Sequence, residues 1–392
     1  MYTHCPVLYC AASDVWVDEP TKNGIIIYSM ITPVLAMCGI IGNLLSFIIL
    51  KTFKRFESST STYLAVLALT DLAASAFLLV SGLCRGILWS KPGWREYEAI
   101  IAIPVGGMFT CWASTAIVGV TIDRIVYLSS PMRAKRPNCC QQKTARLVML
   151  GGLLISILFN VPYCFMYTWD CQGNLAMTPF VKTTFYRIHN WVKLFLFSIL
   201  PALLLLLGNI YLIRHLKKMY KITEECRQRC KMSSKTRDQK LVTITLVLMI
   251  FFFLIGEIPA SLVSRSSVVS LLFWGDETKA DNSKVLEFCR QIATLMNGVY
   301  LAVNFFIYYM FCTNFRACFC EIVACAACWR GRKDKKAIVC EKEQQLAQVN
   351  IFIVDEECKQ SFWVPLADFN WRLIKLFEDN KLAASIIHTA KI

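Results

Sequence analysis

Long apolar runs alternate with short polar connections along most of the chain. Seven runs qualify as membrane spans, at residues 24–50, 62–84, 99–122, 147–169, 191–213, 241–262 and 291–311. A helix of about 20 apolar residues can cross a hydrocarbon core about 30 Å thick. The pattern therefore predicts an all-α membrane protein, a seven-transmembrane helix bundle.

The segments outside the bundle complete the predicted organisation. Residues 1–23 form a short extracellular amino terminus, 24–313 the bundle, 314–329 a juxtamembrane amphipathic helix on the cytoplasmic side, and 330–392 a cytoplasmic tail. Apolar residues make up 56% of the 392 and charged residues only 18%, against about 25% charged in soluble domains. This composition excludes a water-soluble enzyme built around one core.

The basic residues predict the orientation of the chain. Some connections are not strongly basic. One of them, between spans two and three, contains Arg85 and Glu98, and another contains the acidic segment 276–287. The strongly basic connections, which belong on the cytoplasmic side, carry Lys51, Lys54, Arg55, Arg133, Lys135, Arg136, Lys143 and ten further Lys and Arg residues within 214–240. We therefore expect a multi-pass plasma-membrane protein with its amino terminus outside and its carboxyl terminus inside. The basic cytoplasmic connections beside the lipid bilayer then account for most of the net charge of +15, so no nucleic-acid partner is expected.

Charged residues at membrane depth are the first candidate functional residues. Asp71 lies within span two, Asp123 and Arg124 close span three, and Glu257 lies in span six. Each costs about 2.5 to 3.5 kcal/mol on an insertion scale, so each needs a partner or a function. The structural alternatives are an interhelical contact for Asp71 and a solvated helix end for Asp123 and Arg124.

Prolines and amides add polar features inside the spans. Pro162, Pro201 and Pro259 each remove a backbone hydrogen bond and favour a kink. Amides that can satisfy freed carbonyls or bridge helices are Asn43, Asn160, Asn209, Asn297 and Asn304. A role in helix packing is the simplest interpretation of any one amide.

Short motifs recur in a fixed order across the spans. They are Gly42-Asn43, Leu67-Ala-Leu-Thr-Asp71-Leu, Asp123-Arg124-Ile125 with Pro131, Pro201, Phe253 with Pro259, and Asn304-Phe-Phe-Ile-Tyr308. This order resembles the class A (rhodopsin-like) G-protein-coupled receptors from residue 24 to about residue 328. Within that class, Phe159-Asn-Val-Pro-Tyr163, Gly256-Glu-Ile-Pro259 and Thr313-Asn-Phe-Arg316 resemble invertebrate neuropeptide receptors of the FMRFamide and myosuppressin type.

The resemblance implies two groups of site residues. The activation switch would comprise Asp123, Arg124, Phe253, Pro259, Asn304 and Tyr308, with the Arg124 guanidinium held by Asp123 at rest. A polar core able to take a sodium ion, the only cofactor implied, would comprise Asn43, Asp71 and Asn304. The sequence departs from the family pattern in having Ile125 for the usual Tyr, Phe305 for the usual Pro, and Ala113 beside Ser114 for a usual Ser ligand.

Glu257 is the candidate residue of the ligand pocket. It stands where the class usually has a Trp, and its carboxylate would bind an Arg or amide of a peptide or couple the ligand to span six. The alternative is a protonated Glu bonded to a neighbouring helix. Gly106 replaces the Asp of amine receptors, and span seven has no Lys for a retinal Schiff base, so monoamines and retinal are disfavoured.

The cysteines suggest two modifications. The family usually ties the loop after span four to the outer end of span three, and Cys171 supplies the first half of that disulfide. The position near Ala99 has no Cys, so Cys84, Cys289 or a terminal cysteine remain as partners. Candidates for palmitoylation are Cys318, Cys320, Cys325 and Cys328, with a zinc site at the last two as the competing interpretation.

The predicted function is reception of an extracellular ligand, an amidated RFamide-type neuropeptide, with activation of a heterotrimeric G-protein. Arrestin is a further expected partner. A chemosensory or orphan receptor for a small molecule, or a transporter, remains the alternative. An enzyme is not expected, because no nucleophile, base and orienting acid occur together and the His residues lie outside the spans or at their edges.

Overall fold

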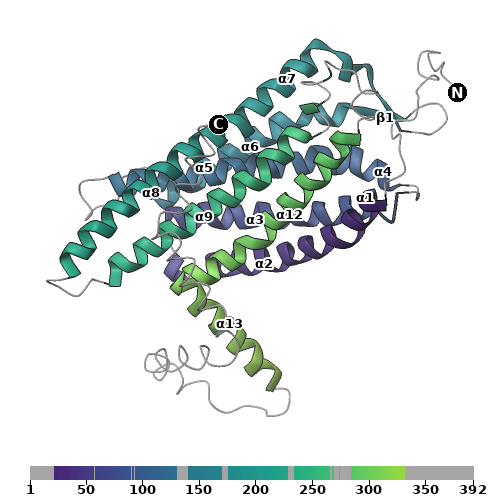
Figure 1. Cartoon of the computed structure of the whole chain (residues 1–392). Helices are drawn as coiled ribbons and strands as arrows, with labels where there is room; N and C mark the ends of the chain where they lie inside the picture. The colour runs from purple at the N-terminus through teal and green to yellow at the C-terminus, as the bar shows by residue number, and fades with distance from the viewer. Residues whose placement is uncertain are drawn as a thin grey trace. The chain divides into compact units, whose positions relative to one another are not determined.

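The computed structural model describes residues 22–56, 58–89, 91, 93–129, 140–169, 175–227, 234–264, 267–268, 273 and 284–331. Cys171 and the predicted tail from residue 332 lie outside these residues, as does the amino terminus up to residue 21. In the part of the chain that is described, seven helices are long and apolar enough to cross a membrane. They run alongside one another in one bundle (Figure 1), which confirms the predicted fold class.

The first half of the bundle holds three spans, two of them built from more than one helical segment. Its elements are α1 (Lys22–Ile26), η2 (Ile27–Ile31), α2 (Thr32–Thr52), η3 (Lys54–Phe56), α3 (Ser59–Arg85), α4 (Trp94–Tyr97), η4 (Glu98–Gly106) and α5 (Gly107–Ser129). Helix α3 begins where Ser58 caps it, because the Ser58 hydroxyl accepts the Ser61 backbone N–H at 3.1 Å.

The second half holds the other four spans and a small hairpin. Its elements are α6 (Gln142–Asn160), η6 (Val161–Phe165), β1 (Tyr167–Trp169), β2 (Leu175–Met177), η7 (Pro179–Lys182), α7 (Thr184–Leu194), η8 (Phe195–Ile199), α8 (Leu200–Arg227), α9 (Ser234–Val263) and α12 (Lys284–Phe311). A separate unit begins at Thr313 with α13 (Thr313–Gly331), where the sequence predicted a helix over 314–329.

The predicted end of span four was wrong. Residues Tyr167–Trp169 form strand β1, which pairs antiparallel with β2, so that Tyr167 faces Met177. Pro162 explains the difference, since it has no N–H to continue the α-helical ladder and α6 gives way to the 3-10 helix η6 at Val161. The hairpin lies at the same end of the bundle as α4 (Figure 1), and we call this the hairpin end.

Three prolines accompany π-helical turns. Pro33 follows η2, Pro104 lies within η4, and Pro201 follows η8. A proline ring pushes away the carbonyl four residues earlier, which widens the preceding turn. Only Pro201 among these was anticipated as a break, and α9 continues as an α-helix through Pro259.

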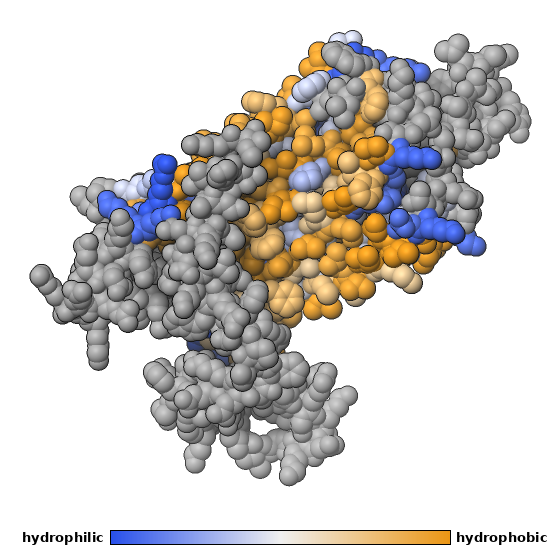
Figure 2. Space-filling view, viewed as in Figure 1, coloured by the Kyte–Doolittle hydropathy of each residue, from blue (hydrophilic) through white to orange (hydrophobic). Residues whose placement is uncertain are grey.

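The outer wall of the bundle is apolar. Leu147, Leu150, Leu154 and Leu158 lie along one face of α6 with 55% to 69% of each residue exposed. Figure 2 shows a broad hydrophobic surface between polar groups at the two ends of the bundle. Such a surface is unfavourable in water and matches hydrocarbon, so the chain is a multi-pass membrane protein.

Candidate functional site

A buried polar core joins α3 to α12 around Asp71, which is 2% exposed. The Tyr300 hydroxyl donates to this carboxylate, 2.9 Å from Oδ1 and 3.1 Å from Oδ2. Asn304 Nδ2 donates to Oδ2 at 2.8 Å. Asn43 Nδ2 reaches the same helix at the Leu301 carbonyl, at 2.9 Å. The structure thus brings Asp71 and Asn304 into direct contact, as the sequence suggested, and places Asn43 on the neighbouring backbone.

Tyr300 is the core residue that sequence reasoning missed. It precedes Asn304 by one helical turn, so both side chains lie on one face of α12 and reach the same carboxylate. The sequence signal that could have identified Tyr300 was its spacing of one helical turn from the polar residue Asn304. The signal was weak because an aromatic residue on the inner face of a span is ordinarily interpreted as packing.

Sodium binding at the polar core around Asp71 stays a prediction. Oxygen ligands suit this cation, and among the described residues the buried oxygens without a hydrogen-bond partner include Asn43 Oδ1, Ser114 Oγ and Asn304 Oδ1. Both carboxylate oxygens of Asp71, however, already accept hydrogens from Tyr300 and Asn304. Each of these oxygens has a second lone pair, so a cation there would compete with the Tyr300 hydroxyl for the carboxylate.

Phe253 extends the polar core toward α9. Its side chain is buried, and its ring meets the Tyr300 ring edge-on, with centroids 5.5 Å apart. Phe253 thus places α9 in contact with the residue that bonds Asp71. Tyr308, the last residue of the predicted switch, is also buried, one helical turn beyond Asn304 on α12.

The Asp123 carboxylate is buried in the last third of α5. Thr60 Oγ1, from the start of α3, donates to Asp123 Oδ2 at 2.6 Å. The Arg124 guanidinium carbon lies 6.0 Å from the centroid of the Tyr127 ring. The contact with Thr60 links the second and third spans, and the pairing of Asp123 with Arg124 stays a prediction.

Glu257 lies on α9 one turn beyond Phe253, half-buried. Ser261 Oγ donates to Glu257 Oε1 at 3.2 Å. Glu257 interacts electrostatically with Asp71 of α3 and with the Cys111 thiol of α5. The carboxylate is therefore directed into the bundle.

A network of charged and polar side chains lies at the hairpin end. Arg85, the last residue of α3, forms an ion pair with Glu98, the first residue of η4, and Glu98 is 5% exposed. Tyr28 donates to Glu287 Oε1 at 3.1 Å, and Gln291 Nε2 donates to the same atom at 3.3 Å. The sequence placed Arg85 and Glu98 in the connection between spans two and three. Their position at two helix ends makes them an interhelical pair instead.

The cysteine predictions are only partly open to inspection. Cys84 is a buried free thiol and Cys289 an exposed one, while Cys171 lies outside the described residues. Helix α13 carries Cys318 and Cys320, whereas the side chains of Cys325 and Cys328 are not described. Across the side chains that are described, His, Cys, Asp and Glu form no group of three that could hold a metal ion.

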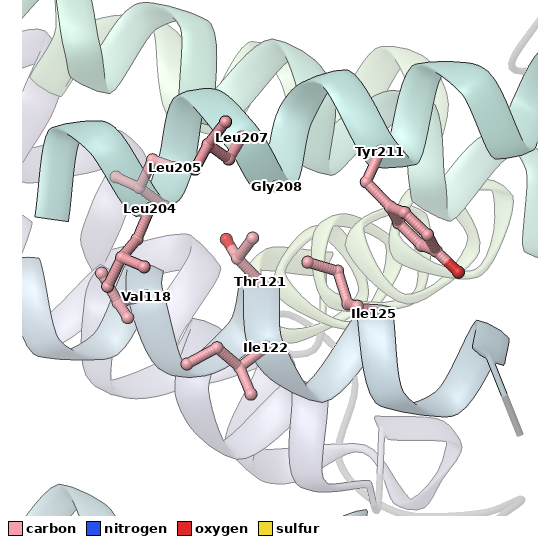
Figure 3. A pocket seen from close by; sticks show the side chains of 9 residues that line it. All are labelled: Val118, Thr121, Ile122, Ile125, Leu204, Leu205, Leu207, Gly208 and Tyr211. Atoms are coloured by element: carbon pink, nitrogen blue, oxygen red, sulfur yellow. The ribbon is translucent and has the colours of Figure 1, made fainter.

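An apolar groove of about 250 Å³ runs between α5 and α8 (Figure 3). Its wall includes Ile122 and Leu207, which are 51% and 64% exposed, so the groove opens on the outer surface of the bundle. The two hydroxyls in its lining are already engaged, because Thr121 donates to the Ile117 carbonyl and Tyr211 bonds Ser129. The groove thus belongs to the lipid-facing wall.

Comparisons with known proteins agree with this geometry. The chain is 22% identical to a probable G-protein coupled receptor of Caenorhabditis elegans, over 83% of this chain and 76% of that protein. It is 25% identical to the FMRFamide receptor of Drosophila melanogaster, over 73% of this chain and 52% of that receptor. It is 22% identical to the sex peptide receptor-related protein 2 of Caenorhabditis elegans, over 61% and 58%.

The family model that matches describes the 7 transmembrane receptor (rhodopsin family), and it covers residues 42–308. That range runs from the first-span Gly-Asn motif to Tyr308 and takes in the whole polar core. The match includes more than half of the chain, in a family of receptors that are not enzymes. With the seven spans and the polar core in place, the chain belongs to the rhodopsin-like family of G-protein-coupled receptors.

Proposed function

We propose that this receptor lies in the plasma membrane with its amino terminus outside, binds an amidated RFamide-type neuropeptide, and activates a heterotrimeric G-protein. Membership of the family implies an extracellular ligand and coupling to a G-protein. The observation that carries the peptide proposal is the Glu257 carboxylate, half-buried and directed into the bundle one turn from Phe253. A half-buried carboxylate favours a cationic partner, which the arginine of an RFamide peptide would supply.

The contacts of Glu257 provide a route from ligand to core. A ligand that draws on this carboxylate acts on α9, whose Phe253 ring touches Tyr300, which bonds Asp71 on α3. A ligand shifts such an equilibrium only by its difference in affinity for the two helix arrangements. The similarity to the Drosophila FMRFamide receptor supports the same class of ligand.

Further parts of the proposal concern partners and modification. The basic cytoplasmic connections would receive the G-protein and, after activation, arrestin. Cys171 would form a disulfide with Cys84, Cys289 or a terminal cysteine, and lipid chains would be attached at Cys318, Cys320, Cys325 and Cys328. Mass spectrometry of the receptor purified from membranes tests both modifications.

The experiment is a measurement of G-protein nucleotide exchange in membranes from cells that display the receptor. An outer tag would first confirm surface display, and a library of amidated neuropeptides would then be applied. We expect saturable activation by an RFamide peptide and a loss of potency of at least about 30-fold in Glu257→Gln, because the cation of the ligand would lose its partner. Glu287→Gln is the matched control, since that carboxylate lies at the hairpin end and is 40% exposed.

Either of two results would overturn the proposal. Silence across the library, despite surface display, would remove the peptide class and leave a small-molecule chemosensory ligand as the alternative. Equal activation of the wild type and of Glu257→Gln would show that the Glu257 carboxylate does not bind the cation of the ligand. Substrate-dependent uptake without nucleotide exchange would favour a transporter.

A further inference from the structure

Lys193 is a cation inside the bundle that the sequence did not single out. It lies near the end of α7, at the hairpin end of span five, and its side chain is half-buried. Its Nζ donates to Asn160 Oδ1 at 2.8 Å and lies 4.0 Å from the centroid of the Tyr163 ring. Those partners belong to α6 and η6, so the ammonium is held between the fourth and fifth spans.

The partners of Lys193 are themselves fixed. Asn160 Nδ2 donates to the Ser156 carbonyl at 2.7 Å, which leaves its Oδ1 directed at Lys193. The Tyr163 hydroxyl donates to Asn190 Oδ1 at 2.6 Å, which holds the ring beneath the ammonium. Lys193 thus enters a prebuilt site and does not extend freely toward solvent.

Span three leaves space for this ammonium at a glycine. A Cβ added to Gly107 would lie 3.2 Å from Lys193 Nζ and 2.5 Å from Asn160 Oδ1. Any larger residue there would push against the charged group. The site therefore includes contributions from spans three, four and five, with the ammonium facing span three.

The charge of Lys193 has no carboxylate partner in the part of the chain that is described. No Asp or Glu oxygen of those residues lies within 4.0 Å of Nζ, and Glu257 is bonded to Ser261. An ammonium has three N–H donors, and the Asn160 amide oxygen and the ring face compensate only part of its lost hydration. An anion from outside the chain would complete the site.

We propose that Lys193, Asn160 and Tyr163 form a ligand subsite that binds a carboxylate of the peptide. This rests on the proposed function, in which a peptide presents its arginine to Glu257. The peptide would enter from the hairpin end, where the connections predicted to be extracellular lie. The two charges then act as a pair of separated anchors, so the preferred ligand carries an acidic group as well as a basic one. An amidated peptide has no terminal carboxylate, so the source is an Asp or Glu side chain.

The first test uses three peptide probes in the nucleotide-exchange assay. They are Asp-Phe-Met-Arg-Phe-amide, its Asn analogue, and the Asn analogue with a free carboxyl terminus. We expect the Asp peptide to be at least about 30-fold more potent than the Asn peptide on the wild type, and the two to be equal on Lys193→Met. A preference for the free acid over both amides would assign the carboxylate to the chain terminus. Equal potency of all three on the wild type overturns the proposal.

Two further variants separate the subsite from a folding defect. Gly107→Ala keeps the charge but fills the space beside Nζ, so it should also reduce the preference for Asp. Lys182→Met removes an exposed lysine of η7 and should leave the preference unchanged. Surface display of each variant through the outer tag identifies a folding defect. An unchanged preference for Asp in both Lys193→Met and Gly107→Ala would place the carboxylate elsewhere.

The second test needs no active peptide, so its failure is distinguishable from failure of the proposed function. Thermal unfolding of the purified receptor would be followed with benzoate and with uncharged benzamide as small probes. We expect benzoate to raise the Tm of the wild type but not of Lys193→Met, and benzamide to raise neither. If benzoate has the same effect on both proteins, Lys193 is not an anion site, whatever the peptides do.

Discussion

Replacing Tyr300 by Phe tests the polar core most directly. The change removes one hydroxyl from a site where Tyr300 and Asp71 are each 2% exposed. Asp71 would keep the Asn304 bond to Oδ2, while Oδ1 would lose the hydroxyl that lies 2.9 Å away. The variant keeps the ring and its edge contact with Phe253. Its effect therefore isolates one hydrogen bond to a buried carboxylate.

The expected loss of stability in Tyr300→Phe follows from two ranges of hydrogen-bond energy that overlap. Hydrogen bonds between membrane helices average about 0.6 kcal/mol and reach about 1.7 kcal/mol. Hydrogen bonds to charged groups contribute about 1.5 to 3 kcal/mol. We expect about 1.5 kcal/mol for Tyr300→Phe, where the ranges overlap. At about 2 to 4 °C per kcal/mol, the Tm of the purified receptor should fall by about 3 to 6 °C.

Tyr28→Phe is the matched control for this measurement. Tyr28 is 3% exposed and also donates to a carboxylate, at 3.1 Å, but that acceptor belongs to Glu287, whose side chain is 40% exposed. Solvent can replace the lost donor there, so we expect a loss of about 0.6 kcal/mol or less. If Tyr300→Phe lowers the Tm no more than Tyr28→Phe, the hydroxyl does not stabilise Asp71 and the reasoning fails.

The same variants test the predicted sodium ion. The Tyr300 hydroxyl donates to both Asp71 oxygens and would compete with a cation for them. Sodium chloride, compared with choline chloride of the same ionic strength, should therefore raise the Tm of Tyr300→Phe more than that of the wild type, by binding only the folded state. An equal effect of sodium on the two proteins would show that the hydroxyl and a cation do not compete for Asp71.

Three further changes probe other contacts through thermal unfolding. Arg85→Met should cost about 1 to 3 kcal/mol, less than a fully buried pair because the arginine side chain is 37% exposed, and adding Glu98→Gln should restore part of it. Thr60→Val should lower the Tm by removing the donor to the buried carboxylate in the last third of α5, while Thr60→Ser should not. Gly208→Ala should be about 1 to 3 kcal/mol less stable than Gly151→Ala, since the new Cβ lies 2.6 Å from a methyl of α5 in the first case and in open space in the second. Equal Tm values within any of these pairs of variants would show that the contact concerned does not stabilise the receptor.

The spans were predictable because bilayer thickness imposes a length that composition reveals directly. The motif residues Asp71 and Asn304 were predictable for a related reason. A polar group in lipid requires a partner, and these two side chains are hydrogen-bonded to each other. The first inference depends only on the length of an apolar segment, and the second only on a polar residue within such a segment. They need no knowledge of how the helices pack.

Features that depend on packing between helices could not be predicted from the sequence. Lys193 lies close to the boundary of its span and looks like a snorkelling lysine until Asn160 and Tyr163 are placed around it. Arg85 and Glu98 look like loop charges until two helix ends meet. The β1–β2 hairpin was missed because the apolar run continued past Pro162, and hydropathy alone cannot distinguish a strand from a helix end.

The charged residues inside the bundle fall into two classes by how they are satisfied. Asp71 has donors on both oxygens from α12, so the chain itself supplies hydrogen bonds to that charge. Among the described residues, Lys193 and Glu257 each have one hydrogen-bond partner, supplied by a neutral side chain, and both remain half-buried. A charge that the fold leaves incompletely compensated gains most from a ligand of opposite charge. In the proposed function, Lys193 and Glu257 would therefore determine selectivity, and the contacts of Phe253, Tyr300 and Asp71 would transmit the signal.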